Sequence, residues 1–159
     1  MSRMFTAKEL IGFAVEIEKS GIAFYSEAAK KSKDTKAQEL YKFLIDEEAK
    51  HQKIFQGLLA GLEKQVMSAE AMTVTEEYKS FMKALVDSAI FKKDALAKGV
   101  LKNDMAILDY ALGREKDSVI FYSDMRKLVP EKDLKQLDQI IIEERSHIVK
   151  LLDIKSKLS

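Results

Sequence analysis

The two halves of this sequence repeat one pattern of acidic, aromatic and histidine residues, and the repeat limits the folds open to the chain. Residues 18–25 (Glu-Lys-Ser-Gly-Ile-Ala-Phe-Tyr) align without gaps on residues 115–122 (Glu-Lys-Asp-Ser-Val-Ile-Phe-Tyr). A Glu-x-x-His tetrad follows each stretch, at residues 48–51 and 144–147, after nearly equal intervals. Self-similarity of this kind predicts two equivalent units related by a pseudo-twofold axis.

Hydrophobic periodicity predicts four long helices. We expect them at about residues 6–31, 35–62, 103–129 and 130–157. Thr6 with Glu9, and Thr35 with Gln38, have the spacing of capping boxes that would open the first two helices. The links within the first pair and within the second pair are only a few residues long, so each pair must form an antiparallel hairpin.

A crossover of about 40 residues, 63–102, joins the two hairpins. It is too long for a tight turn, and its pattern predicts shorter helices at residues 75–86 and 94–101. A long crossover lets the second hairpin start at the same end of the bundle as the first, so that the second and third long helices run parallel. The sequence therefore predicts an all-α four-helix bundle of two antiparallel hairpins, in a single domain over residues 1–159.

The composition excludes several functional classes. The formal net charge of +1 implies no strong attraction to nucleic acid or to a membrane surface. The absence of cysteine excludes disulfides, iron–sulfur clusters and thiol nucleophiles. The N-terminus lacks the apolar run of a secretory signal, and no stretch approaches the length of a membrane span. We therefore expect a cytoplasmic protein.

Four glutamates occupy positions where helical spacing calls for apolar residues. They are Glu18, Glu48, Glu115 and Glu144. An unpaired carboxylate in a dry interior costs several kcal/mol and normally takes up a proton, whereas two divalent cations would cancel all four charges. His51 and His147 each follow a tetrad glutamate by three residues, on the same helix face and about 5–6 Å away. Oxygen and imidazole ligands together suit iron or manganese.

Each of these residues has a simpler explanation when it is taken alone. A glutamate on an apolar stripe can extend its carboxylate to water, and a helical histidine can be an ordinary core or surface residue. Tyr25 and Tyr122 can be core aromatics, or they can hydrogen-bond a ligand glutamate. Taken together, these simpler explanations are weaker, because glutamates on apolar helix faces, each pattern ending in a histidine, recur at matched places in both halves. Glu47 and Glu143 have polar neighbours at helical spacing, and we assign them to the outside of the bundle or to the support of the ligands.

One Glu from each of two helices and a Glu-x-x-His from each of the other two resemble the ferritin-like di-iron carboxylate arrangement. The Glu-x6-Tyr stretches and the Glu-Glu-x-x-His runs are most similar to its rubrerythrin-like branch. The resemblance implies a ferritin-like bundle that binds two iron ions, with manganese as the alternative metal. It assigns the first ion to Glu18 and His51, the second to Glu115 and His147, and a bridging role to Glu48 and Glu144. Tyr25 and Tyr122 are the candidate catalytic side chains, which would orient the carboxylates.

The same resemblance implies a di-iron oxidoreductase that reduces hydrogen peroxide or dioxygen in oxidative-stress defence. Typical rubrerythrins append a rubredoxin domain with four iron-binding cysteines, which this chain lacks, so we expect electrons from an external donor protein. Ser118 stands where those proteins carry an additional ligand glutamate, so the iron movement attributed to that glutamate is not expected here. A ferroxidase or iron-handling protein is the first alternative, and a non-catalytic metal-binding or structural bundle is the second. The apolar stripes of the crossover leave a homodimer open.

Overall fold

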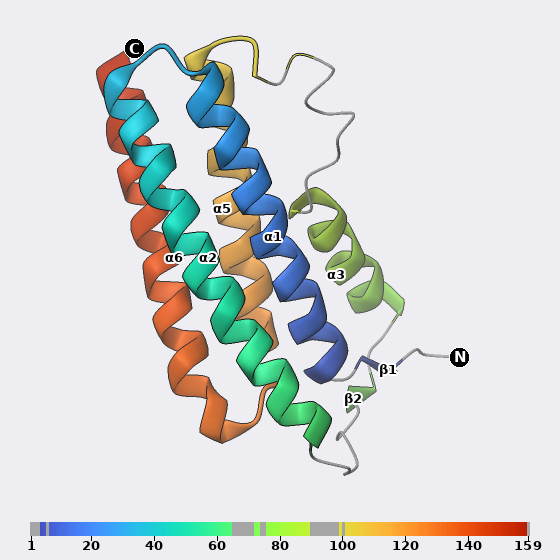
Figure 1. The fold of residues 1–159 in the computed structure, drawn as a ribbon. Helices are drawn as coiled ribbons and strands as arrows, with labels where there is room; N and C mark the ends of the chain where they lie inside the picture. The colour runs from blue at the N-terminus through green and yellow to red at the C-terminus, as the bar shows by residue number, and fades with distance from the viewer. Residues whose placement is uncertain are drawn as a thin grey trace.

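Four long helices form the body of the protein in the computed structural model (Figure 1). They are α1 (Ala7–Lys31), α2 (Thr35–Lys64), α5 (Asp104–Met125) and α6 (Glu131–Leu158). The structure describes residues 4–5, 7–64, 72–73, 76–89, 99 and 101–158. The expected cap at Thr6 lies outside these residues, and so does nearly all of the expected helix at 94–101. The four expected long helices are confirmed.

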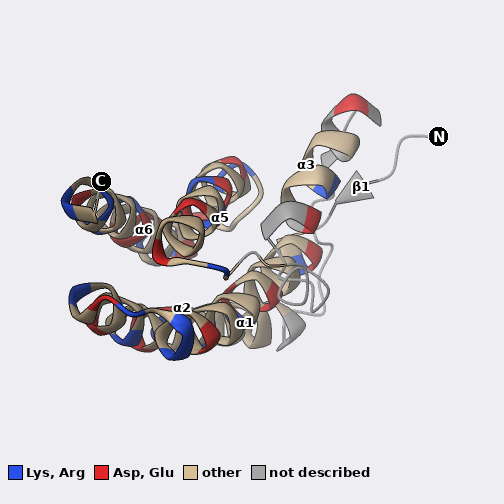
Figure 2. Cartoon of the chain, turned by 90° about the horizontal axis from the view of Figure 1, so that it is seen from above, with Lys and Arg blue, Asp and Glu red and all other residues tan. Residues whose placement is uncertain are grey.

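The helices pair as two hairpins, α1 with α2 and α5 with α6. Seen from above, the hairpins lie face to face, with α2 opposite α6 and α1 opposite α5 (Figure 2). Helices α2 and α5 run in the same direction along the bundle, as the long crossover predicts (Figure 1). The all-α bundle of two antiparallel hairpins is thus confirmed. None of the described helices combines the length and the apolar character that crossing a membrane requires.

The described part of the crossover contains α3 (Glu76–Ala89), which packs against α5 and α1. The expected helix at 75–86 is therefore present and extends three residues further. Two short strands, β1 (Met4–Phe5) and β2 (Met72–Thr73), pair antiparallel, with Met4 opposite Thr73. They join the start of the chain to the crossover and leave the helical class of the fold unchanged.

The start of α2 differs from the expected capping box. The backbone N–H of Ala37 donates to Asp34 Oδ1 at 2.8 Å, so the capping side chain is Asp34 and the assignment of Thr35 to this role is wrong. The Gln38 amide donates instead to the carbonyl oxygen of Ser32 at 2.6 Å. The start of α5 is as expected, because Asn103 Oδ1 accepts from the backbone N–H of Ala106.

Helix α5 ends at Met125 and not near Val129 as the sequence suggested. The N–H groups of Leu128 and Val129 both donate to the carbonyl oxygen of Met125, at 2.9 and 3.1 Å, which closes a tight turn. Pro130 disfavours helical geometry in the residue before it and cannot donate a backbone hydrogen bond. The turn therefore occupies residues 126–129, and α6 begins immediately after the proline.

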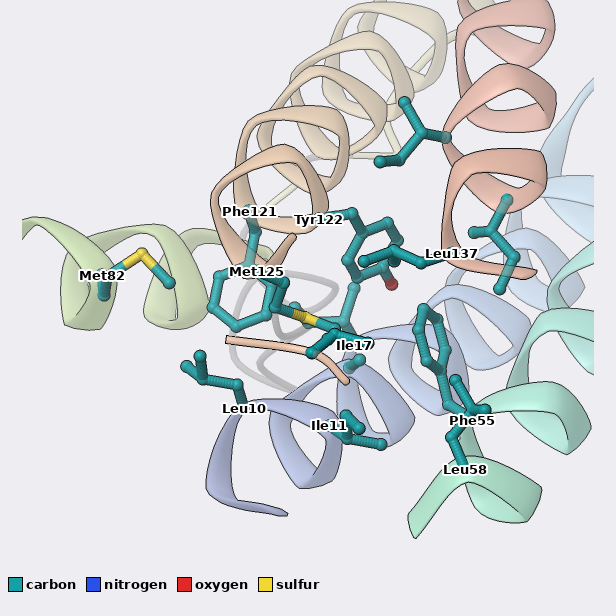
Figure 3. Packing of buried hydrophobic residues seen from close by; sticks show 14 residues of the cluster. Leu10, Ile11, Ile17, Phe55, Leu58, Met82, Phe121, Tyr122, Met125 and Leu137 are labelled. Carbon is teal, nitrogen blue, oxygen red and sulfur yellow. The ribbon is translucent and has the colours of Figure 1, made fainter. Parts of the chain in front are cut away.

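Two apolar clusters fill the interior, one toward each end of the bundle. The first gathers Leu10, Phe55 and Leu137 from three of the long helices, and α3 adds Met82 (Figure 3). The second gathers Phe24, Tyr41 and other residues near the α1–α2 turn and the start of α5. Neither cluster contains the predicted ligand residues, which form a polar layer between the two.

Candidate metal centre

The structure places all six candidate metal-ligating residues in this polar layer. Helices α1 and α5 each contribute one glutamate, and α2 and α6 each contribute a Glu-x-x-His pair. None of the six is more than 3% exposed. They are Glu18, Glu48, His51, Glu115, Glu144 and His147. Because each pair lies three residues apart on one helix, its two side chains reach the same point of the interior.

The ligand atoms form two inner groups that share one residue. One group contains Glu48, Glu115, Glu144 and His147, and the other contains Glu18, His51 and Glu144. Within each group the candidate ligand atoms lie within 4.8 Å of one another. Glu144 belongs to both groups and Glu48 to only one, whereas the resemblance implied that both would bridge.

Several atoms of these groups have no hydrogen-bond partner among the described residues. They are Glu115 Oε2, Glu144 Oε2 and His147 Nδ1 in the first group and Glu18 Oε2 in the second. His147 Nδ1 lies 3.3 Å from Glu144 Oε2 and 3.7 Å from Glu115 Oε2. Buried polar atoms are nearly always hydrogen-bonded, so atoms left unpaired around a common point fit a bound cation.

The two candidate catalytic tyrosines bind the glutamates of the opposite hairpin. The Tyr25 hydroxyl on α1 donates to Glu115 Oε1 on α5 at 2.5 Å. The Tyr122 hydroxyl on α5 donates to Glu18 Oε1 on α1 at 2.6 Å. Each bond satisfies one carboxylate oxygen and leaves Oε2 facing the centre. The reciprocal pair follows the pseudo-twofold relation of the repeat.

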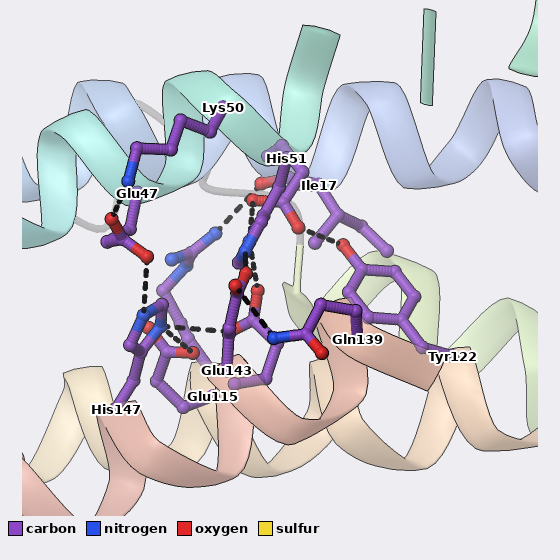
Figure 4. Close-up of polar contacts among 12 residues, drawn as sticks. Ile17, Glu47, Lys50, His51, Glu115, Tyr122, Gln139, Glu143 and His147 are labelled. Atoms are coloured by element: carbon purple, nitrogen blue, oxygen red, sulfur yellow. Dashed lines mark hydrogen bonds and ion pairs between the residues drawn. The ribbon is translucent and has the colours of Figure 1, made fainter. Parts of the chain in front are cut away.

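The first glutamate of each Glu-Glu-x-x-His run lies against the histidine of the other run (Figure 4). Glu143 Oε2 lies 2.7 Å from His51 Nε2, and Glu47 Oε2 lies 4.0 Å from His147 Nε2. Of the two expectations for Glu47 and Glu143, support of the ligands fits these contacts; Glu47 is buried, and Glu143 remains partly exposed. A carboxylate on the outer nitrogen fixes the ring so that Nδ1 faces the inner glutamates. Glu143 also accepts from Gln139, and Glu47 pairs with Lys50.

Crowding of the acids changes their proton affinity. Burial and the charges of Glu115 and Glu18 raise the pKa of Glu144 to about 8. Burial and the same kind of repulsion, led by Glu18, hold the pKa of Glu48 well above its usual value. Without a cation, burial and this repulsion therefore favour the protonated forms of these two carboxyl groups.

The other two acids are held ionised by the groups around them. Burial opposes ionisation of Glu115, but the neighbouring Glu144 and His147 and the hydrogen bond from Tyr25 lower its pKa to about 2. Hydrogen bonds likewise outweigh burial at Glu18 and lower its pKa. Against the opposing effect of burial, the neighbouring inner glutamates raise the pKa of His51 to about 11 and of His147 to about 10. In the metal-free protein, protons bound to the inner glutamates and histidines thus offset the negative charge that metal cations would otherwise neutralise.

The sequence profile of the family described as rubrerythrin matches residues 9–155, nearly the whole chain. The chain belongs to the rubrerythrin family. A solved structure from Thermotoga maritima, provisionally described as a ferritin-like diiron-carboxylate protein, is similar to it with a TM-score of 0.75 and 20% identity, covering 100% of both chains. This likeness confirms the ferritin-like fold. Curated proteins gave no match. Together with family membership, the buried cluster is compatible with two iron ions.

One buried residue of this rubrerythrin-family centre, Arg114, was not predicted from the sequence. Arg114 directly precedes Glu115 on α5, and its side chain is buried at 3% exposure. Its helical spacing from the apolar residues Ile107, Ala111 and Phe121 is the signal that could have found it. Ser118, three residues after Glu115 on α5, is also buried.

Proposed function

We propose that this chain holds two iron ions and reduces hydrogen peroxide or dioxygen with electrons from an external donor protein. The observation that carries the proposal is the set of unpaired ligand atoms, Glu115 Oε2, Glu144 Oε2 and His147 Nδ1, that meet in a buried layer. Groups of this composition, with carboxylate oxygens and imidazole nitrogens only, suit iron or manganese.

In the proposed centre each half supplies one ion with its own ligands. Glu18 and His51 bind one ion, and Glu115 and His147 bind the other. Glu144 serves both, which its membership of both inner groups supports. Two ferrous ions, when bound, supply the two electrons that, with two protons, convert hydrogen peroxide to two molecules of water.

The protein contributes orientation, proton placement and exclusion of water. Tyr25 and Tyr122 hold the carboxylates of Glu115 and Glu18 by their Oε1 atoms and so fix the direction of Oε2. Glu143 holds the outer nitrogen of His51. The apolar clusters on both sides of the layer keep bulk water from the centre, which strengthens electrostatic interactions there.

Peroxide turnover tests the proposal. The anaerobically iron-loaded protein is supplied with a chemical reductant and hydrogen peroxide, and peroxide loss is followed over many equivalents. We expect sustained consumption that stops when the reductant is exhausted, and Glu144→Gln is the inactive control. Accumulation of ferric mineral without sustained peroxide loss would favour the ferroxidase alternative. Metal-dependent thermal stabilisation with no spectral response to peroxide or dioxygen would favour a structural metal site.

A further inference from the structure

Arg114 is the only lysine or arginine that is buried among the described residues, at 3% exposure. Its Nη2 donates to the carbonyl oxygen of Ile17 on α1 at 3.1 Å. The guanidinium also lies over the ring of Phe24, 5.7 Å from the ring centroid. These contacts hold the cation inside the bundle, next to the candidate ligands. A charged group is costly to bury, so a role beyond packing has to be considered.

Arg114 and Glu48 converge on the bare backbone of Gly21. A Cβ placed on Gly21 would lie 2.6 Å from Glu48 Oε2 and 3.1 Å from Arg114 Nη1. The glycine thus leaves room for one oxygen of Glu48 beside the guanidinium.

The repeat is broken at these positions. In the gapless alignment of residues 18–25 with 115–122, Gly21 matches Ser118, and the residue before the aligned stretch is Ile17 in one half and Arg114 in the other. The two tetrad glutamates differ accordingly. Glu144 lies against both histidines, 2.8 Å from His51 Nδ1 and 3.3 Å from His147 Nδ1. Glu48 lies on the side of Gly21 and Arg114.

We propose that Arg114 is a positioning residue that makes the two metal positions unequal. It engages one oxygen of Glu48, so that Glu48 serves only the ion bound by Glu115 and His147. The first ion therefore occupies the four-residue group, and the second binds more weakly to Glu18, His51 and Glu144. This inference rests on the proposed two-metal centre.

Anaerobic calorimetric titration with ferrous iron tests whether the two metal positions differ in affinity. We expect the wild-type protein to bind two ions in two steps whose affinities differ by more than about tenfold, because Glu48 gives the four-residue group a carboxylate that the other group lacks, and charges interact strongly at short range in a dry site. Arg114→Gln should narrow the difference to less than about threefold by tightening the second step. Arg114→Lys keeps the charge and should keep two distinct steps. Lys116→Gln, an exposed change on the same helix, is the matched control.

Two histidine variants identify the positions. His147→Ala should remove the tight step, and His51→Ala should remove the weak one. If Arg114→Gln does not fold, Gly21→Ala takes its place, because the added methyl group must displace Glu48 Oε2. Gly21→Ala should also narrow the difference between the affinities of the two binding steps.

The outcomes separate this inference from the proposed function. Two results would overturn the role of Arg114 alone. One is that the wild-type protein binds both ions with the same affinity. The other is that the ratio of the two affinities stays at its wild-type value in both Arg114→Gln and Gly21→Ala. A wild-type protein that binds fewer than two ions would contradict the two-metal centre itself. A purely structural role for Arg114 would lower the melting temperature and leave the ratio of the two affinities unchanged.

Discussion

Glu144 is the side chain on which the two halves of the centre meet, since it belongs to both inner groups. We expect Glu144→Gln to lower ferrous binding from two ions to at most one per chain. The metal-free variant should be at least as stable as wild type, because a neutral amide replaces an acid whose ionisation is disfavoured by burial and by Glu115. Metal analysis after anaerobic loading and thermal melting measure the two effects.

Glu143→Gln is the matched control for this change. Glu143 supports His51 from the partly exposed side and is not a member of either inner group. The variant should retain two ions with an affinity lower by about 10–100-fold. Loss of both ions in Glu143→Gln, together with full loading of Glu144→Gln, would contradict the assignment of inner and outer acids.

The hydroxyl of Tyr25 should contribute to stability through its bond to Glu115. Tyr25→Phe removes a donor from a buried carboxylate, and we expect a loss of about 1–3 kcal/mol in the free energy of unfolding of the metal-free protein. Urea denaturation measures it. Tyr41→Phe is the control. The ring of Tyr41 stacks on that of Tyr25, with 5.9 Å between the ring centroids, but its hydroxyl has no hydrogen-bond partner among the described residues. An equal loss in both variants would argue against a specific role for the Tyr25 hydroxyl.

At the level of the helices, the periodic pattern predicted the elements better than their ends. The apolar stripes located all four long helices, because burial of one face depends on spacing alone. The ends depend on local competition for backbone groups. Asp34 and Thr35 are both good capping residues, and only the structure shows that the Asp34 carboxylate reaches the free N–H of Ala37. Pro130 marked the start of α6 but left open where α5 would end.

The cap of α2 can be tested by two neighbouring substitutions. We expect Asp34→Ala to lower the free energy of unfolding by about 1 kcal/mol, because it leaves the N–H of Ala37 without its acceptor. Thr35→Ala should cost less than about half of that, since Thr35 is exposed and its side chain is not the cap. Chemical denaturation of both variants decides between them. A larger loss in Thr35→Ala would restore the capping box that the sequence suggested.

Over the whole molecule, the repeat predicted the site more completely than any single motif. Six ligand candidates were identifiable because acids on apolar stripes recur at matched places, and the repeat implied that they would meet. Arg114 and the crosswise bonds from Tyr25 and Tyr122 were not identifiable in this way. Arg114 breaks the repeat. The bonds from the two tyrosines depend on how the two hairpins face each other, which the periodicity of one helix does not determine.

The stability of the metal-free protein should fall as the pH rises above neutrality. His51 and His147 have folded-state pKa values of about 11 and 10, and Glu144 has one of about 8, all above their ordinary values. The folded state therefore binds more protons than the unfolded state from about pH 4.5 upward, and stability is lost as the pH rises through the folded-state values. Glu115, with a pKa of about 2, acts in the opposite sense below pH 4.5.

Thermal melting of the metal-free protein between pH 6 and pH 10 measures this loss. We expect the melting temperature to decrease steadily over that range. Metal loading should flatten the dependence, because bound cations take the place of the protons on these groups. A metal-free melting temperature that rises with pH would contradict the buried proton-sharing cluster.

The central claim is that four buried acids are tolerated because two cations neutralise them. Anomalous diffraction at the iron edge, from crystals grown anaerobically with ferrous iron, tests it most directly. We predict two anomalous peaks in the layer between the apolar clusters, one beside His51 and Glu18 and the other beside His147 and Glu115. A layer without any peak, in crystals whose protein is shown to be exposed to excess iron, would contradict the claim.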